Sequence, residues 1–387
     1  MSRIAHRVAH FGTTIFTEMT SLANQHQAIN LGQGFPDFAA PSFLKEAAQA
    51  AVAADINQYA PANGRLRLRQ AIAGKMARQY GLEVDAEREV LVTHGATEAI
   101  FAAVLGLVNP GDEVVLFEPT YDSYTPAVQL AGGIPRYYTL RQPDWVVEPQ
   151  ALAALFSPRT RLVIVNTPHN PTGKVFTAAE LALIAGLCRQ YDALVLSDEV
   201  YEHILFDGLA HQPIAALPDM FARTVTVSSL GKTFSVTGWK VGWAVGPADL
   251  LAGLFRVHQF MTFCGAAPLQ EAAATALEMA DSLDYYKTLG AFYQQKRDFL
   301  VDVLQAAGLQ PISPQGTYFV MAQIGHLGFA DDVAFCRHLT MQTGVAAIPP
   351  SAFYHNPTAG AHLARFAFCK SDHTLAQAAA RLRQLPI

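Results

Sequence analysis

The sequence lacks the long apolar segments, the cysteine pairs and the metal-binding motifs that mark several common classes of protein. Among its 387 residues, no apolar run reaches the roughly 18–20 residues that cross a bilayer. The four cysteines are far apart and form no Cys-x-x-Cys pair, and the 13 histidines show no His-Glu-x-x-His spacing. We therefore expect no membrane span, no disulfide framework and no bound metal.

An excess of positive charge is missing as well. The chain has 27 Lys and Arg against 32 Asp and Glu, a formal net charge of −5. Nucleic acids and anionic membranes attract basic proteins, so this balance argues against either partner. Unpaired thiols are typical of a reducing compartment, and we expect a cytoplasmic protein. The basic segment Met1–Phe16 leaves a transit peptide as an alternative.

What the sequence does contain is an alternation of short apolar runs with longer helical patterns. The runs expected to form strands are Glu89–Thr93, Glu113–Phe117, Ile134–Thr139, Arg161–Asn166, Ala193–Ser197, Thr224–Val227 and Val241–Val245. Residues 162–165 and 193–196 are apolar throughout, as strands covered on both faces are. The alternation predicts an α/β protein with a mostly parallel, doubly wound sheet.

After about residue 275 the pattern changes to that of a smaller α+β unit. Helices are expected at Leu283–Ala307, Asp331–Thr343 and His373–Leu385, and short strands around Tyr318–Met321, Ala346–Ile348 and Ala364–Phe368. We predict an N-terminal arm with part of a small domain over 1–40, a large domain over 41–275 and a C-terminal small domain over 276–387. The stretch Leu31–Pro41, rich in Pro and Gly, indicates a loop or linker.

One segment suggests a covalently bound cofactor. Lys232 lies among glycines and hydroxyls directly after the apolar run Thr224–Val227, and Lys240 follows behind a Gly-Trp pair. Small residues let a backbone approach a cofactor, hydroxyls and a cation bind phosphate, and an amine forms a Schiff base with an aldehyde. The segment therefore predicts a phosphorylated aldehyde held by Lys232.

Two further motifs each have a functional and a structural interpretation. Gly95–Glu98 closes a strand and opens a helix, where exposed N–H groups attract phosphate, but plain N-capping by Thr97 is the alternative. The loop Asn166–Gly173 follows a strand of the predicted parallel sheet, where ligands bind. Asn, Pro and Gly also favour turns, so an ordinary turn is the alternative for this loop.

Two charged residues need partners if they are buried. Asp198, in Ser197–Tyr201 at another strand end, could pair with a pyridinium nitrogen, and Tyr201 could contact a phenolate oxygen on the same ring. Helix capping by Asp198 is the alternative. Arg365 lies in the apolar stretch Ala364–Phe368, where a substrate carboxylate would satisfy it, as would a structural salt bridge.

Taken together and in this order, Asn170-Pro-Thr-Gly, Ser197–Tyr201, Ser229-x-x-Lys232 and Arg365 resemble the class I and II aminotransferases of fold type I, which use pyridoxal 5′-phosphate. The resemblance covers essentially the whole chain. It is closer still to the bacterial methionine aminotransferase branch, related to the kynurenine and glutamine aminotransferases, at Gly12–Phe16, Asn30–Asp37, Asn57–Pro61 and Gly344–Pro349. It implies a large domain with a mostly parallel seven-stranded sheet, a smaller α+β domain, and a homodimer with shared active sites.

The resemblance also implies a role for each matching residue. Lys232 would form the Schiff base, Asp198 would pair with the pyridine nitrogen, and Tyr201 would contact the ring oxygen O3′ with Asn170. The ring would stack on Tyr121. The phosphate would be bound by Ala96, Thr97, Ser229 and Lys240, and by Tyr59 of the other subunit. The substrate carboxylate would be held by Arg365, Gly34 and Asn170. Lys240 departs from many relatives, which carry arginine there.

The expected reaction moves the α-amino group of a neutral amino acid to a 2-oxo acid by a ping-pong mechanism. Methionine is favoured, because no additional arginine for a second carboxylate is evident and a flexible thioether suits aromatic walls. Candidate walls are Phe16, Tyr59, Phe263 and Phe353, with core packing as the alternative for the last two.

Three rival functions are weighed against this one. A kynurenine- or glutamine-type enzyme with cysteine-conjugate β-lyase activity would use the same motifs. The ligand-sensing part of a transcription regulator would carry an added DNA-binding module, whereas the aminotransferase resemblance begins by residue 12. A nicotinamide-binding Rossmann enzyme would need a third, helix-opening glycine after Gly32-Gln-Gly34, and the sequence has none there. The transcription regulator and the nicotinamide-binding enzyme are therefore disfavoured.

Overall fold

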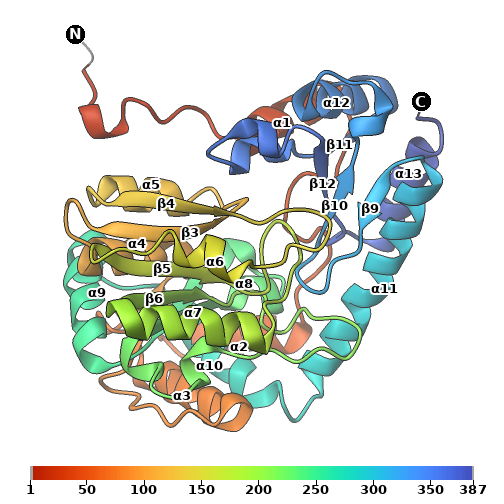
Figure 1. Cartoon of the computed structure of the whole chain (residues 1–387). Coiled ribbons are helices and arrows are strands. Elements are labelled where there is room, and N and C mark those ends of the chain that lie inside the picture. The colour runs from red at the N-terminus through yellow and green to blue at the C-terminus, as the bar shows by residue number, and fades with distance from the viewer. Residues whose placement is uncertain (1–2, 386–387) are drawn as a thin grey trace.

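The computed structural model describes residues 3–385 and contains a central sheet with helices on both faces (Figure 1). Its strand order is β2-β8-β7-β6-β5-β3-β4. The strands are β2 (Val90–His94), β3 (Glu113–Glu118), β4 (Ile134–Thr139), β5 (Thr160–Asn166), β6 (Leu194–Asp198), β7 (Thr224–Ser229) and β8 (Val241–Val245). All pairs are parallel except those of β8 with β2 and β7. The predicted strands and the mostly parallel α/β fold are confirmed.

Each central strand is buried on both faces, because successive side chains of a strand point to opposite sides. Val114 and Leu116 of β3 pack in a cluster with helices α4 (Gly95–Leu107), α5 (Tyr124–Leu130) and α9 (Ala248–Met261). Val115 and Phe117 of the same strand pack on the other face with α6 (Pro149–Ala153) and α7 (Ala178–Tyr191). This double burial explains the uninterrupted apolar runs in the sequence.

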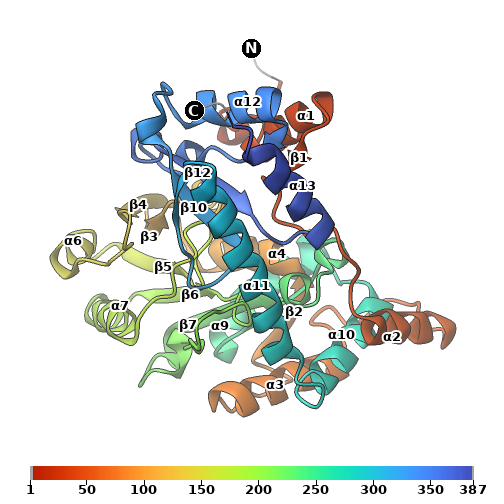
Figure 2. The ribbon, with the colours of Figure 1, turned by 90° about the vertical axis from the view of Figure 1, so that its right-hand side faces the viewer.

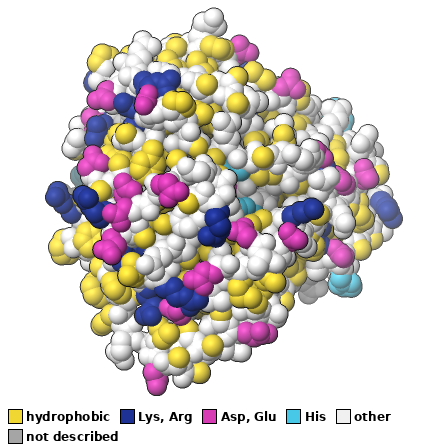
Figure 3. Space-filling model, turned by 90° about the horizontal axis from the view of Figure 1, so that it is seen from below, with side chains coloured by type: hydrophobic (Ala, Val, Ile, Leu, Met, Phe, Trp, Pro, Cys, Tyr) yellow, Lys and Arg dark blue, Asp and Glu magenta, His cyan; other side chains and the backbone are white. Residues whose placement is uncertain are grey.

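A third helical layer covers the end of the sheet at β2 and β8. It consists of α2 (Ser42–Ala53), α3 (Leu66–Tyr80) and α10 (Ala267–Met279). Seen from below, the molecular surface mixes Lys and Arg with Asp and Glu side chains, in keeping with the nearly even charge balance (Figure 3). Within residues 3–385, no helix is both long and apolar enough to cross a membrane.

A second, smaller group of elements lies beside this sheet. Strands β9 (Gln310–Ile312), β10 (Phe319–Gln323) and β12 (Leu363–Ala367) form an antiparallel sheet, and β1 (Ile29–Asn30) pairs in parallel with β11 (Val345–Ala346). Around them pack α1 (Ile15–Gln25), α11 (Tyr285–Ala306), α12 (Asp332–His338) and α13 (Asp372–Leu382). Helix α11 begins beside α10 and ends beside the small sheet (Figure 2). The β1–β11 pair supports placing part of residues 1–40 in the small domain, while the domain boundaries stay a prediction.

Three details differ from the sequence-based expectation. Strands β1 and β9 were not expected; each is only two or three residues long, and β9 contains Pro311, which weakens a strand signal. The predicted helix Asp331–Thr343 is divided into α12 and a π-helical turn, Leu339–Thr343. The stretch Leu31–Pro41 has no helix or strand, but Leu31 is fully buried, so its start belongs to the core.

Helices α4 and α9 approach each other at a pair of glycines. A Cβ atom added at Gly106 of α4 would lie 2.7 Å from the carbonyl carbon of Gly253 in α9. That distance is shorter than real Cβ contacts, so a side chain at Gly106 would push the two helices apart. In α7, by contrast, a Cβ atom added at Gly186 would meet no atom within 4 Å.

These two glycines give a matched pair of stability tests. Gly106→Ala should lower the free energy of unfolding by about 1–3 kcal/mol, because it overpacks the α4–α9 contact. Gly186→Ala should raise it by about 0.5–1 kcal/mol, because alanine favours a helix more than glycine does. Urea denaturation followed by circular dichroism measures both, and a stabilising Gly106→Ala would contradict the close contact.

Candidate active site

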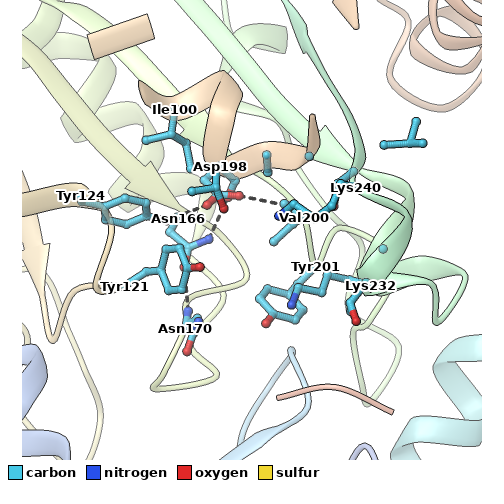
Figure 4. A pocket seen from close by; sticks show the side chains of 17 residues that line it. Ile100, Tyr121, Tyr124, Asn166, Asn170, Asp198, Val200, Tyr201, Lys232 and Lys240 are labelled. Atoms are coloured by element: carbon cyan, nitrogen blue, oxygen red, sulfur yellow. Dashed lines mark hydrogen bonds between the residues drawn. The ribbon is translucent and has the colours of Figure 1, made fainter. Parts of the chain in front are cut away.

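Four strands of the central sheet end at the same edge, and the motifs that follow them line one cavity (Figure 4). Strand β2 is antiparallel to β8, which is antiparallel to β7, so β2 points the same way as β5, β6 and β7. Ligands bind outside the carboxyl ends of such strands. The cavity brings together these predicted site residues: Ala96, Thr97, Tyr121, Asn170, Asp198, Tyr201, Ser229, Lys232 and Lys240.

The amine of Lys232 lies in this cavity, on the short helix α8 (Leu230–Thr233) that follows β7. Its Nζ atom is 5.7 Å from the ring centroid of Tyr201 and 5.6 Å from that of Tyr318. Burial lowers the pKa of Lys232 to about 8, because apolar surroundings disfavour the ammonium form. A part of these amines is therefore neutral near pH 7, as a nucleophile or base requires.

The carboxylate of Asp198 is buried at the end of β6. Its Oδ2 accepts a hydrogen bond from the Tyr124 hydroxyl at 2.7 Å, and its Oδ1 accepts one from the Val200 N–H at 3.3 Å. Burial raises the pKa of Asp198 to about 6, while both hydrogen bonds favour the charged form. Residues 200–203 form a turn, so Asp198 does not cap a helix as the alternative proposed.

Asn166 connects the ends of β5 and β6 (Figure 4). Its Nδ2 donates to the carbonyl oxygen of Asp198 at 2.9 Å, and its Oδ1 accepts from the Asn170 N–H at 2.7 Å. Sequence reasoning selected neither Asn166 nor Tyr124 as a site residue. Asn166 was detectable because it opens the motif that ends at Gly173. Tyr124 was not, since it lies 74 residues from Asp198 in the chain.

Helix α4 begins where two glycines and Lys240 lie close together. A Cβ atom at Gly242 would lie 2.4 Å from the carbonyl carbon of Gly95 and 2.7 Å from the Ala96 nitrogen, so only glycine lets β8 approach this helix start. A Cβ atom at Gly95 would lie 3.2 Å from the Lys240 Nζ. Helix N–H groups and an ammonium thus converge on one point, which favours a phosphate. Thr97 does not act as the N-cap, because the N-cap residue is His94.

The guanidinium of Arg365 is buried in β12 and bonds neutral oxygens. Nη1 donates to Asn170 Oδ1 at 3.3 Å and Nη2 to the Gly32 carbonyl at 2.8 Å, while Nε has no partner among the described residues. Its Cζ lies over three aromatic rings, 5.1, 4.1 and 5.3 Å from the centroids of Phe16, Phe319 and Phe353. Burial lowers the pKa of Arg365 to about 10, so it stays charged at pH 7. These contacts differ from the structural salt bridge considered as the alternative.

The loop after β1 presents backbone carbonyls to side chains of the smaller part of the molecule. Arg365 bonds the carbonyl of Gly32, and the Tyr318 hydroxyl donates to the carbonyl of Gly34. Lys370 Nζ donates to the carbonyl of Phe35 at 2.8 Å. A Cβ atom at Gly34 would lie 2.6 Å from the Phe319 ring, which explains the glycine. Gly34 therefore lies beside the surroundings of Arg365, outside the cavity lining.

The four predicted wall residues divide into two pairs. Phe16 and Phe353 lie together at Arg365, with ring centroids 5.7 Å apart, and Phe353 is buried. Tyr59 and Phe263 pack edge to face at 5.4 Å, outside the cavity lining, and are 84% and 48% exposed. Within residues 3–385, no group of three or more His, Cys, Asp or Glu side chains could hold a metal ion.

Comparison with known proteins identifies the family. Residues 26–382 match the model for aminotransferases of class I and II. A methionine aminotransferase of Escherichia coli K12 is 48% identical over 379 residues, 98% of this chain and 97% of that protein. A kynurenine–oxoglutarate transaminase of Dictyostelium discoideum is 40% identical over 415 residues, 98% of this chain and 95% of that protein.

A solved structure agrees with these matches. The N-succinyldiaminopimelate aminotransferase of Mycobacterium tuberculosis superposes with a TM-score of 0.96 and 45% identity, over 99% of this chain and 100% of that one. The similarity spans the large sheet, the smaller part and the loops that form the cavity. As its motifs indicated, the chain belongs to the class I and II aminotransferases and is an aminotransferase.

Proposed function

We propose that this aminotransferase uses pyridoxal 5′-phosphate to move the α-amino group of a neutral amino acid, methionine first, to a 2-oxo acid in two half-reactions. One observation carries the proposal: a lysine amine of lowered pKa, a buried carboxylate and an anion-binding helix start line the same cavity. The activity of the E. coli relative supports methionine as the first choice of donor.

The phosphate end of the cofactor fits the start of α4. Gly95 and Gly242 leave space that a Cβ atom at either position would fill, and the ammonium of Lys240 lies beside Gly95. The Ala96 and Thr97 N–H groups would hold the phosphate together with Lys240 and Ser229, which also line the cavity. A lysine supplies a point charge rather than the planar fork of arginine, which is sufficient for a phosphate.

The ring end of the cofactor fits the opposite side of the cavity. Lys232 would hold the aldehyde carbon, Asp198 the pyridine nitrogen, and Tyr201 with Asn170 the ring oxygen, while Tyr121 would cover a ring face. When bound, the cofactor supplies an aldehyde for the amino group and a ring that withdraws electrons from the substrate Cα.

Lys232 and Asp198 would perform the proton chemistry. With a pKa of about 8, about a tenth of the Lys232 amines are neutral at pH 7, and a neutral amine can take the proton from the substrate Cα. With a pKa of about 6, Asp198 is mostly a carboxylate at pH 7. It would accept a hydrogen bond from the protonated ring nitrogen and so keep that proton in place.

Arg365 and the aromatic rings around it would position the substrate. The guanidinium retains a buried donor, Nε, without a partner among residues 3–385, and a carboxylate would satisfy it. Holding the carboxylate here with Asn170 would direct the Cα–H bond, which supplies the proximity contribution to the rate. Phe16 and Phe353 beside Arg365 would favour an apolar side chain such as a thioether.

The proposal includes a homodimer with shared active sites and a cytoplasmic location. Tyr59, Phe260 and Phe263 are 84%, 88% and 48% exposed, and exposed aromatic groups of this kind mark a surface that another protein covers. A second copy of the chain covering them would bring Tyr59 to the phosphate of its partner. The four cysteines are free, which supports a reducing compartment.

The first test replaces the proposed covalent attachment point. Lys232→Ala should abolish the visible absorbance band that the cofactor gives when joined to the lysine, and should lower kcat by at least about 100-fold, since general acid–base catalysis contributes at least that much. Absorption spectra and transamination assays measure both. Lys45→Ala, on the exposed side of α2, is the control. Normal turnover by Lys232→Ala would refute the assignment.

The second test concerns the charge of Asp198. Tyr124→Phe removes a hydrogen bond that favours the carboxylate, so the pKa of Asp198 should rise from about 6 by about one to two units. Affinity for pyridoxal phosphate, titrated into cofactor-free protein between pH 5 and 8, should then start to fall at a higher pH than in the parent. Tyr191→Phe, at the end of α7, should leave the profile unchanged. Identical profiles for Tyr124→Phe and the parent would argue against this role.

The third test establishes the substrate. Methionine should give a kcat/KM at least about tenfold above that of aspartate, because an aromatic wall accepts an apolar side chain and rejects a second charge. Amino donors, including kynurenine and glutamine, are compared with a fixed 2-oxo acid. The kynurenine–oxoglutarate transaminase relative supports a kynurenine donor. The alternative to the main proposal is therefore a kynurenine- or glutamine-type enzyme that also has cysteine-conjugate β-lyase activity. Pyruvate and ammonia released from a cysteine conjugate without any 2-oxo acid would favour that alternative, and a preference for aspartate would contradict both.

A further inference from the structure

A buried ion pair adjoins the turn that follows Asp198 and carries Tyr201. Lys75 Nζ of α3 lies 2.5 Å from Glu202 Oε2, and the two side chains are 2% and 3% exposed. Burial alone would raise the pKa of Glu202, but Lys75, His203 and His211 together outweigh it and hold that pKa below its ordinary value. Glu202 is thus an ionised carboxylate directly after Tyr201 in the chain.

The same carboxylate joins three separate elements. Its Oε2 accepts a hydrogen bond from the Tyr80 hydroxyl, also in α3, and its Oε1 accepts one from Ser228 Oγ at 2.7 Å. Ser228 is in β7 and immediately precedes Ser229, which lines the cavity. The short helix α8, which carries Lys232, follows Ser229. Glu202 therefore fixes the turn with Tyr201 to the end of β7 and holds both against α3.

A second carboxylate fixes the other end of this turn. Glu199 follows Asp198, and its Oε1 accepts a hydrogen bond from Ser197 Oγ at 2.7 Å. Its Oε2 lies 2.7 Å from His211 Nε2. The turn between Asp198 and Tyr201 is thus held at both ends by buried, fully bonded carboxylates.

The arrangement is better explained by positioning than by stability. Replacing a buried ion pair with apolar side chains is often neutral for stability, because desolvation of the two charges offsets their attraction. What the pair supplies is a fixed geometry between α3 and two elements that line the cavity, the turn with Tyr201 and the end of β7. We propose that Glu202, held by Lys75, is a positioning residue that sets Tyr201 and Ser229 against the cofactor; this rests on the proposed use of pyridoxal phosphate.

The main experiment is Ser228→Ala, which breaks the link to β7 and leaves the ion pair intact. Titrated into cofactor-free protein, pyridoxal phosphate should bind about tenfold more weakly, since a hydrogen bond to a charged group is worth about that factor. The melting temperature of the cofactor-free protein should change by only a few degrees. The double variant Lys75→Met with Glu202→Leu leaves no unpaired charge, and it should fold and bind the cofactor at least about tenfold more weakly.

A matched control separates positioning from general loss of packing. Met76→Ala truncates a buried side chain of α3 next to Lys75 and should lower the melting temperature without changing cofactor affinity. If Met76→Ala weakens cofactor binding as much as Ser228→Ala does, the positioning role is wrong.

Binding by the parent chain is measured first, so that two failures are told apart. If the parent does not bind pyridoxal phosphate, the proposed function fails and this inference with it. If the parent binds and both Ser228→Ala and the double variant bind equally tightly, only the inference is overturned.

Discussion

The proposed chemistry depends on the desolvation of one amine and one carboxylate at the same edge of the sheet. Lys232 and Asp198 both lie where low polarity disfavours charge, so the pKa of the amine falls to about 8 and that of the carboxyl rises to about 6. The pKa values of both groups therefore lie close to neutral pH, where a small change in the surroundings of a group adds or removes its proton. The hydrogen bond from the Tyr124 hydroxyl stabilises the ionised form of Asp198.

The topology of the sheet makes this meeting of groups possible. Residues far apart in the chain converge because the carboxyl ends of β2, β5, β6 and β7 share one edge. Strand β8 runs in the opposite direction, so Lys240, which precedes it, lies at the start of α4. Gly95 and Gly242 allow this close approach between β8 and α4. The small sheet then contributes Arg365 from outside the central layer. Lys232 and Lys240 therefore come from the central sheet and its connections, whereas Arg365 comes from the small sheet.

Much of this organisation could be predicted from the sequence, because the strong signals are local. Residues 162–165 and 193–196 are uninterrupted apolar runs, and the motifs that follow β2, β5, β6 and β7 are rich in glycine, proline, hydroxyl or charged residues. Features that depend on contacts with residues distant in the chain could not be predicted. Strand β1 is defined by its pairing with β11, the burial of Leu31 by the core around it, and the importance of Tyr124 by a single bond to Asp198. Neither hydrophobic periodicity nor the structural propensity of single residues predicts such contacts.

The carbonyls of Gly32, Gly34 and Phe35 are all bonded by side chains of the smaller part of the molecule, Arg365, Tyr318 and Lys370. The loop is thus attached to the small sheet by its main chain, although it joins the large part covalently through α2. A rotation of the small sheet toward the cavity would carry the loop as a rigid extension of itself. Arg365 and the loop would then change position relative to the cavity together, as one body.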